Sequence, residues 1–126
     1  MSLRSPLSRV LGLGTAKKGT GHFLSQRISA LGLLLLGGWF AYRMFTFGSF
    51  AYLEVIRFIG SPFNSVLLLL LVLTLAYHSW LGVQVVIEDY VHAPGVKLFA
   101  LIASRFAHLL VAAVSAYAIL QIGLGT

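Results

Sequence analysis

Three long apolar stretches dominate the chain, at residues 24–47, 63–87 and 96–123. Each can cross about 30 Å of hydrocarbon, because an α-helix rises about 1.5 Å per residue. Polar residues are concentrated in the two connections, at residues 48–62 and 88–95. The pattern therefore predicts an all-α fold with three transmembrane helices, in a single domain over residues 1–126 that opens with a basic arm at residues 1–23.

The second connection is short and contains a turn signal, His92-Ala93-Pro94-Gly95. Proline lacks a backbone N–H and clashes with the preceding helical turn, so Pro94 cannot continue the second helix. A connection of this length places its two flanking helices side by side and antiparallel.

Basic residues gather before and at the start of the first apolar stretch: Arg4, Arg9, Lys17, Lys18 and Arg27. Cytoplasmic segments of membrane proteins carry an excess of lysine and arginine, so we expect the N-terminus in the cytoplasm. Three crossings then put the uncharged C-terminal tail on the opposite side. Arg43 and Arg57 would lie on the outer side, which then carries fewer basic residues than the inner side.

Composition supports a membrane protein and excludes several function classes. Hydrophobic residues make up 59% of the chain and charged residues 10%, against about 45–50% and about 25% in soluble domains. With no cysteine, the chain cannot form disulfides, thiolate zinc sites or iron–sulfur ligands of its own. The net charge of +6 is scattered beside apolar stretches, which argues against a nucleic-acid-binding patch.

His78 is the first candidate for a functional site, because it lies inside the second apolar stretch. An ionisable side chain is costly in hydrocarbon, so it marks a site when a partner can be named. The obvious partner of an imidazole is a metal, in particular a haem iron. The alternative is a histidine that hydrogen-bonds to a neighbouring helix as a packing contact.

The same helix carries two further candidates, Asp89 and Tyr90. At 100° per residue, Asp89 lies within about 20° of His78 around the helix and about 16 Å along it. Gly82, one turn after His78, leaves room that a flat macrocycle would need. The Tyr90 hydroxyl lies beside Asp89 at the predicted inner interface, where the head of an amphiphilic quinone would dock.

His108 is an alternative ligand at a similar depth in the third stretch. A haem held between His78 and His108 would need no partner chain. However, Ser104 and Arg105 precede His108 by one turn and Ser115 follows it, which favours a polar seam between helices or the lining of a pathway. A proton relay through His78, Arg105 and His108 is a third possibility.

Arg27 has two interpretations at the inner end of the first stretch. It is either a topology anchor whose guanidinium extends to the interface, or a cation that pairs with a carboxylate such as a haem propionate.

The motif at residues 78–90 resembles the hydrophobic membrane anchor of succinate dehydrogenase (complex II), the D subunit. It contains His78-x-x-x-Gly82, then Gln84, then Asp89-Tyr90. The segment Gly19-Thr20-Gly21-His22-Phe23, followed by Gln26-Arg27, is similar to the bacterial form of that family. The total length, the three spans and the short second connection agree with it.

The resemblance implies a set of roles. In this family the C and D anchors hold one haem b between two histidines, one from each chain, and His78 matches the histidine of the D subunit. Tyr90 matches a tyrosine that helps to bind ubiquinone, with Asp89 beside it, and Arg27 matches an arginine near the haem propionates and the quinone. Flavin and iron–sulfur clusters belong to two soluble partners, a flavoprotein subunit and an iron–sulfur subunit.

We therefore expect an anchor of succinate:ubiquinone oxidoreductase in the bacterial inner membrane, without enzyme activity on its own. The arginine- and serine-rich start, free of acidic residues, also resembles an organellar transit peptide and keeps the mitochondrial inner membrane as a second possibility. A self-contained cytochrome with haem between His78 and His108, and the proton relay, remain the alternatives.

Overall fold

The structure, a computed structural model, describes residues 16–125. Within this range the chain is helical and has no β-strand: α2 (Ala16–Phe45), α3 (Tyr52–Gly60), α4 (Pro62–Tyr90) and α5 (Pro94–Leu124). The three long helices are apolar and long enough to span a membrane, so the predicted fold class is confirmed. Arg4 and Arg9 of the predicted basic arm lie outside the described residues.

The long helices extend beyond the predicted spans. α2 begins at Ala16, well before residue 24, and α4 continues to Tyr90 rather than residue 87. Hydropathy marks the part of a helix that fits in hydrocarbon, whereas the backbone hydrogen bonds that define the helix continue into the interface. Pro94 opens α5, as its missing N–H predicts, because the first helical N–H has no partner within the helix.

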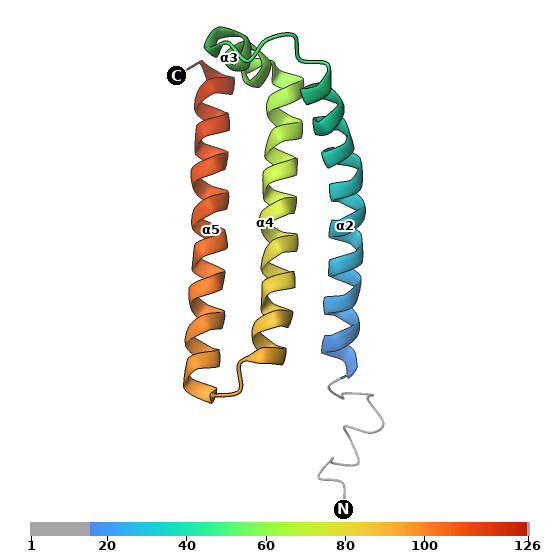
Figure 1. Ribbon diagram of the computed structural model, residues 1–126, viewed down its shortest axis with the longest axis vertical. Helices are drawn as coiled ribbons and strands as arrows, with labels where there is room; N and C mark the ends of the chain where they lie inside the picture. The colour runs from blue at the N-terminus through green and yellow to red at the C-terminus, as the bar shows by residue number, and fades with distance from the viewer. Residues whose placement is uncertain (1–15, 126) are drawn as a thin grey trace, which may run out of the picture.

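Helix α3 was not anticipated in the first connection. Its exposed side carries the ion pair between Arg57 Nη1 and Glu54 Oε1, at 2.8 Å. Phe58, on the other side, is buried and packs near Trp39 and Phe47. The segment is therefore a short amphipathic helix that covers one end of the molecule, as Figure 1 shows.

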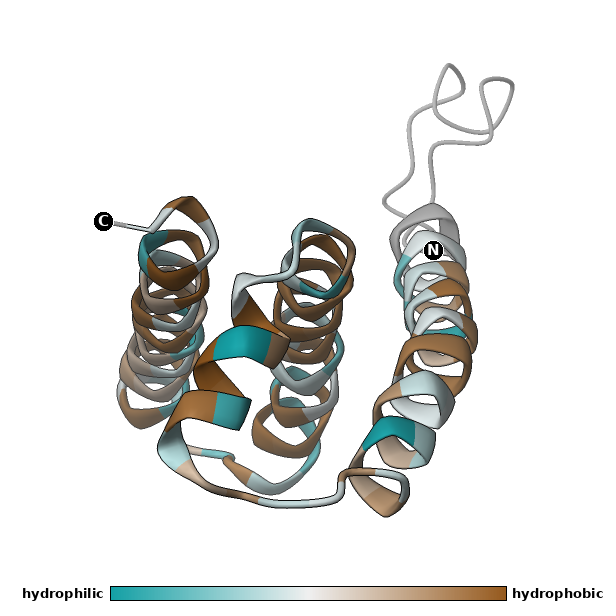
Figure 2. Cartoon of the chain, turned by 90° about the horizontal axis from the view of Figure 1, so that it is seen from above, coloured by the Kyte–Doolittle hydropathy of each residue, from teal (hydrophilic) through white to brown (hydrophobic). Residues whose placement is uncertain are grey.

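The three long helices stand in a row with α4 in the middle (Figures 1 and 2). Helix α4 contacts both α2 and α5, whereas no Cα atoms of α2 and α5 lie within 8 Å of each other. The predicted pairing of the second and third spans is thus confirmed. Four hydrophobic side chains are buried in the described part of the chain: Phe58, Leu68, Leu81 and Ile119. Both broad faces of α4 remain open.

At the end covered by α3, the helices are tied together by close backbone approach and polar contacts. A Cβ atom added at Gly123 would lie 2.7 Å from Ser65 Oγ. That hydroxyl donates a hydrogen bond to the Ile59 carbonyl, and Asn64 Nδ2 donates one to the Phe58 carbonyl at 2.9 Å. These contacts join α3, α4 and α5, while at the other end of the row the turn before Pro94 joins α4 to α5.

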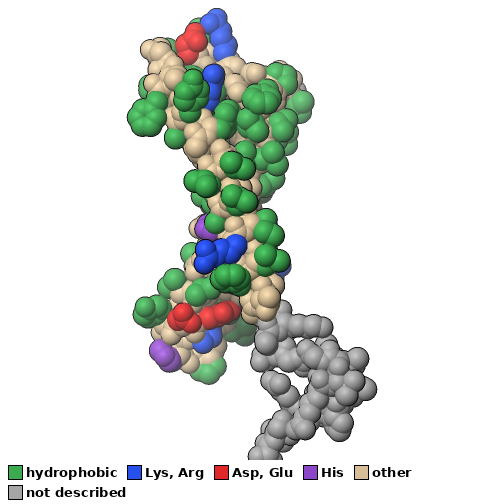
Figure 3. Space-filling model, turned by 90° about the vertical axis from the view of Figure 1, so that its right-hand side faces the viewer, with side chains coloured by type: hydrophobic (Ala, Val, Ile, Leu, Met, Phe, Trp, Pro, Cys, Tyr) green, Lys and Arg blue, Asp and Glu red, His purple; other side chains and the backbone are tan. Residues whose placement is uncertain are grey.

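Figure 3 shows how charge is distributed over the side of the molecule that it presents. Acidic side chains lie toward the two ends, which agrees with the positions of Glu54 on α3 and of Glu88 and Asp89 at the end of α4. Hydrophobic side chains cover much of the upper half, and basic and histidine side chains also lie in the narrow middle. The middle of the row is therefore not purely apolar.

Candidate functional site

His78 lies in the interface between α4 and α2. Its Nδ1 atom is 2.8 Å from the hydroxyl oxygen of Ser29. Ser29 is buried, with 6% of its surface exposed, and the imidazole is half-buried. The hydrogen bond joins two residues 49 positions apart in the sequence, so it depends on the packing of two membrane helices.

A second hydrogen bond of Ser29 indicates which atom is the donor in its contact with His78. Ser29 Oγ donates to the carbonyl oxygen of Gln26 at 3.0 Å, so its single hydrogen is already used. Both contacts are made together when the hydroxyl accepts from His78 and Nδ1 carries the proton. A neutral imidazole protonated on Nδ1 presents the lone pair of Nε2. Nε2 has no hydrogen-bond partner within the described residues and is the nitrogen that a metal could bind.

The side of α2 that faces α4 is polar around this contact. His22, Gln26 and Ser29 follow the spacing of one helical face. His22 Nε2 and Gln26 Oε1 are buried without a hydrogen-bond partner within the described residues. Gln26 also reaches Gly82, where an added Cβ atom would lie 3.8 Å from Gln26 Nε2. The space beside Gly82 is thus bordered by Gln26 of α2, and the room that a macrocycle would need beside His78 stays a prediction.

Arg27 is not brought to His78 by this fold. It lies about 200° around α2 from Ser29, is exposed, and places its guanidinium 5.0 Å from the centre of the Phe23 ring. No carboxylate pairs with it among residues 16–125. Any contact between Arg27 and an anion therefore needs a group from outside the described chain.

His108 has a different environment, although it lies at the predicted depth. Its Nδ1 donates to the Ser104 carbonyl at 2.7 Å, and its Nε2 lies 3.1 Å from the hydroxyl of Ser79, the residue after His78. Both nitrogens thus have partners in this chain, and the imidazole joins α5 to α4. The predicted polar seam between α4 and α5 is present. In the described structure, His108 lines two pockets between α4 and α5, and His78 lines neither of them.

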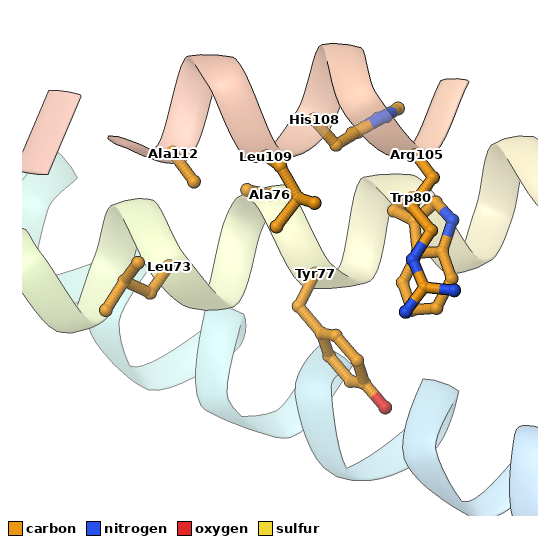
Figure 4. Close-up of a pocket in the computed structure, with 8 residues that line it drawn as sticks. All are labelled: Leu73, Ala76, Tyr77, Trp80, Arg105, His108, Leu109 and Ala112. Atoms are coloured by element: carbon orange, nitrogen blue, oxygen red, sulfur yellow. The ribbon is translucent and has the colours of Figure 1, made fainter. Parts of the chain in front are cut away.

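Arg105 borders the pocket between α4 and α5 that Figure 4 shows. Its guanidinium lies 5.4 Å from the centre of the Trp80 ring. The pocket holds about 240 Å³, slightly below the range of about 300–1,000 Å³ for sites that bury a small molecule. His78 is not among its lining residues, and no hydrogen bond links it to Arg105 or His108 in the described structure. The relay through His78, Arg105 and His108 stays a prediction.

Asp89 and Tyr90 end α4 as exposed side chains. Neither makes a hydrogen bond or ion pair within residues 16–125, whereas the neighbouring Glu88 accepts from Gln84 Nε2 at 2.8 Å. Lys97 Nζ donates to the Glu88 carbonyl at 2.9 Å and closes the turn to α5. Because α4 remains helical to Tyr90, Asp89 keeps its predicted alignment with His78, about 16 Å along the axis.

Sequence reasoning named His78 and missed the residues around it. His22 and Gln26 enter the sequence analysis only as part of the segment that resembles the bacterial family, and Ser29 does not enter it at all. The spacing of His22, Gln26 and Ser29 places them on one face of a helix, and the sequence shows this. It does not show that this face packs against His78, because that depends on which helix lies beside α4. In the described residues, no group of three or more His, Cys, Asp or Glu side chains is placed to hold a metal ion.

Comparison with known proteins identifies the family. A family model described as succinate dehydrogenase/fumarate reductase transmembrane subunit matches residues 1–120. The succinate dehydrogenase hydrophobic membrane anchor subunit of Rickettsia bellii is 38% identical over 88 residues, 70% of each chain. The proteins of the same name from Rickettsia typhi and Rickettsia prowazekii are each 40% identical. These alignments cover 62% and 61% of this chain and 62% of each relative.

The matches agree with the architecture. Three membrane-length helices with exposed apolar surfaces and a polar seam fit a subunit whose remaining contacts come from lipid and other proteins. The chain belongs to the family of succinate dehydrogenase and fumarate reductase transmembrane subunits, as a membrane anchor of the succinate dehydrogenase type.

Proposed function

We propose that the chain supplies one axial ligand, His78, to a haem b shared with a second membrane anchor, the C subunit. We also propose that it forms part of the site where ubiquinone is reduced, at the end of α4. The observation that carries the haem assignment is the environment of His78. One ring nitrogen is fixed by Ser29, and the other is free within the described chain.

The residues present fit a haem shared between chains. His78 offers a neutral imidazole nitrogen at mid-span, which is a suitable ligand for haem iron. His108 is a weaker candidate, because both of its nitrogens are bonded within this chain. A second ligand therefore has to come from a partner, and α4 has open faces on which a partner helix can pack. Bound haem would supply a one-electron carrier inside the membrane.

The quinone assignment depends on the end of α4. Tyr90 and Asp89 are exposed and have no partner within residues 16–125. A tyrosine hydroxyl can donate a hydrogen bond to a quinone carbonyl, and an adjacent carboxylate can hold or deliver a proton. Two electrons and two protons convert the quinone to the quinol. The electrons would come from succinate through partner subunits, and the protons from the aqueous side nearest Tyr90.

The proposed orientation follows from charge. A cytoplasmic N-terminus puts the start of α2 and the end of α4 on the same inner side, as their common end in Figure 1 allows. The iron–sulfur and flavoprotein subunits would dock there, beside Tyr90. For a chain that resembles Rickettsia proteins, the membrane would be the bacterial inner membrane.

The test is a reduced-minus-oxidised optical spectrum of purified membranes. The chain is expressed alone, together with the C subunit, and within the four-subunit complex. A b-type spectrum that needs the C subunit supports a shared haem. A b-type spectrum from the chain alone would instead support a cytochrome that uses His78 and His108, and no haem in any sample would overturn the haem assignment.

A further inference from the structure

We propose that Ser29 is a positioning residue for His78, which sets the tautomer of the imidazole and the donor strength of Nε2. The inference rests on the proposed function of His78 as a haem ligand and adds a residue on a different helix. Ser29 cannot itself bind the iron. It would act through His78, so α2 would contribute to the haem site without supplying a ligand.

The first step is the direction of the hydrogen bonds. Because the Gln26 carbonyl can only accept, the Ser29 hydroxyl donates to it at 3.0 Å and keeps its lone pairs for the His78 Nδ1–H at 2.8 Å. The opposite arrangement would leave the Gln26 carbonyl without this donor. Only the Nδ1-protonated form of His78 satisfies both contacts, and that form leaves the Nε2 lone pair available to bind a metal.

The second step is rigidity. Ser29 is one of two buried polar residues in the described part of the chain; the other is Ser65, at the opposite end of the row. One turn farther along, Gly32 brings α2 close to α4, where an added Cβ atom would lie 3.4 Å from Thr74 Cγ2. The hydroxyl is thus held by the packing of both helices, so the imidazole plane cannot rotate without breaking the 2.8 Å contact.

The third step concerns the metal. When a histidine binds a metal through one ring nitrogen, a hydrogen bond donated by the other nitrogen fixes the orientation of the ring and raises the basicity of the ligating nitrogen. A more basic Nε2 favours ferric over ferrous haem iron. A neutral hydroxyl is a weaker acceptor than a carboxylate, so the imidazole remains protonated at Nδ1. Removing the hydroxyl should therefore shift the midpoint potential of the haem in the positive direction and weaken its retention.

The experiment uses the assembled complex with four variants. Ser29→Ala removes the acceptor, and Ser29→Thr and Ser29→Val form a pair of similar shape that differs in the hydroxyl. Ser79→Ala is the matched control, because it removes a hydroxyl that contacts the other half-buried imidazole, His108, at a similar depth. Readouts are the midpoint potential, the low-spin electron paramagnetic resonance signal, and the haem-to-flavin ratio after detergent exchange.

We expect a positive shift in potential, an altered low-spin signal, and haem loss that is faster by about tenfold or more in Ser29→Ala and Ser29→Val. Ser29→Thr and Ser79→Ala should match wild type. Wild-type potential and signal in Ser29→Ala would overturn the inference, and so would failure of Ser29→Ala to assemble, because the hydroxyl would then act in packing. His78→Ala separates the two proposals: if it keeps a bis-histidine haem, the ligand assignment itself fails.

Discussion

The hydroxyl of Ser79 lies 3.1 Å from Nε2 of His108, although the residue before it, His78, contacts α2 through Ser29. The two imidazoles thus lie at the same depth on different sides of α4. One joins α4 to α5 and uses both ring nitrogens, and the other leaves Nε2 free. Their roles can therefore be separated by substitution.

His78→Ala should remove haem b or leave it five-coordinate. Tyr77 and Ser79 lie about 100° away on either side of the helix, so neither can take the place of the imidazole. The complex should still assemble, because α2, α4 and α5 pack through many other contacts. The reduced-minus-oxidised spectrum and the low-spin resonance signal measure the result.

His108→Ala is the control for this substitution. It should leave the haem spectrum unchanged while it removes the contacts to Ser79 and Ser104. A low-spin bis-histidine signal that survives in His78→Ala and disappears in His108→Ala would assign the ligand to α5 instead.

Arg27→Leu should alter the haem potential or the Michaelis constant for quinone without reversing the topology. The other basic residues before the span, Lys17 and Lys18 among them, still favour a cytoplasmic N-terminus. The lost interaction would be a charge-assisted hydrogen bond to a propionate or quinone oxygen outside this chain. Arg27→Lys is the control, since it keeps the charge and loses the fork of donors. Wild-type values for both measurements in Arg27→Leu would leave Arg27 as a topology anchor.

Tyr90→Phe should slow electron transfer from succinate to ubiquinone about five- to tenfold, as expected for a lost hydrogen bond of about 1–1.5 kcal/mol. Succinate oxidation by a soluble dye should stay near wild type, because the flavoprotein is intact. The measured quantity is the ratio of the two activities. Asp89→Asn should lower the same ratio if the carboxylate supplies the proton.

Tyr117→Phe is the matched control for Tyr90→Phe. Tyr117 is another exposed tyrosine, on α5 near the opposite end of the row. An unchanged ratio in Tyr90→Phe, or an equal decrease in Tyr117→Phe, would remove Tyr90 from the quinone site.

Gly123→Ala should lower the thermal stability of the membrane domain. The new methyl group would lie 2.7 Å from Ser65 Oγ and 3.3 Å from Ser65 Cβ, so the Ser65 side chain or the two helices must shift, which disturbs the hydrogen bond from Ser65 to the Ile59 carbonyl. Overpacking of this kind costs about 1–3 kcal/mol. Thermal unfolding of the purified complex, followed by the loss of its haem or quinone activity, measures the change.

Gly37→Ala is the control for that prediction, because no atom lies within 4 Å of a Cβ added there. It should melt with wild type or slightly above it, since alanine favours a helix over glycine. Equal melting temperatures for the two variants would show that the contact between α4 and α5 near Gly123 accommodates the methyl group with no loss in the free energy of unfolding.

The spans and their pairing could be predicted because they depend on local quantities. Membrane thickness fixes the length of an apolar stretch, and Pro94 fixes a turn that forces α4 and α5 together. Helix α3 was missed because its amphipathic period covers only nine residues, in a connection where polar and apolar residues both occur. Its folding depends on Phe58 reaching α2 and α4, which the sequence does not show.

The candidate site could be predicted in part for a similar reason. A histidine in hydrocarbon is conspicuous, so His78 and His108 both stood out. Choosing between them required hydrogen bonds across helices, to Ser29 in one case and to Ser79 in the other. Such contacts depend on the rotation of each helix about its axis, and hydropathy alone leaves that rotation undetermined.

The row of three helices also has a consequence in the cell. Because α2 and α5 do not meet, neither covers the outer side of the other in the described part of the chain, and the exposed Arg105 faces the bilayer until another subunit covers it. A copy made in excess of its partners would thus expose a charged side chain to lipid, which is unfavourable, and it should be degraded sooner than an assembled copy. The amount of this subunit at steady state should follow the supply of its partners, whatever the rate of its own synthesis.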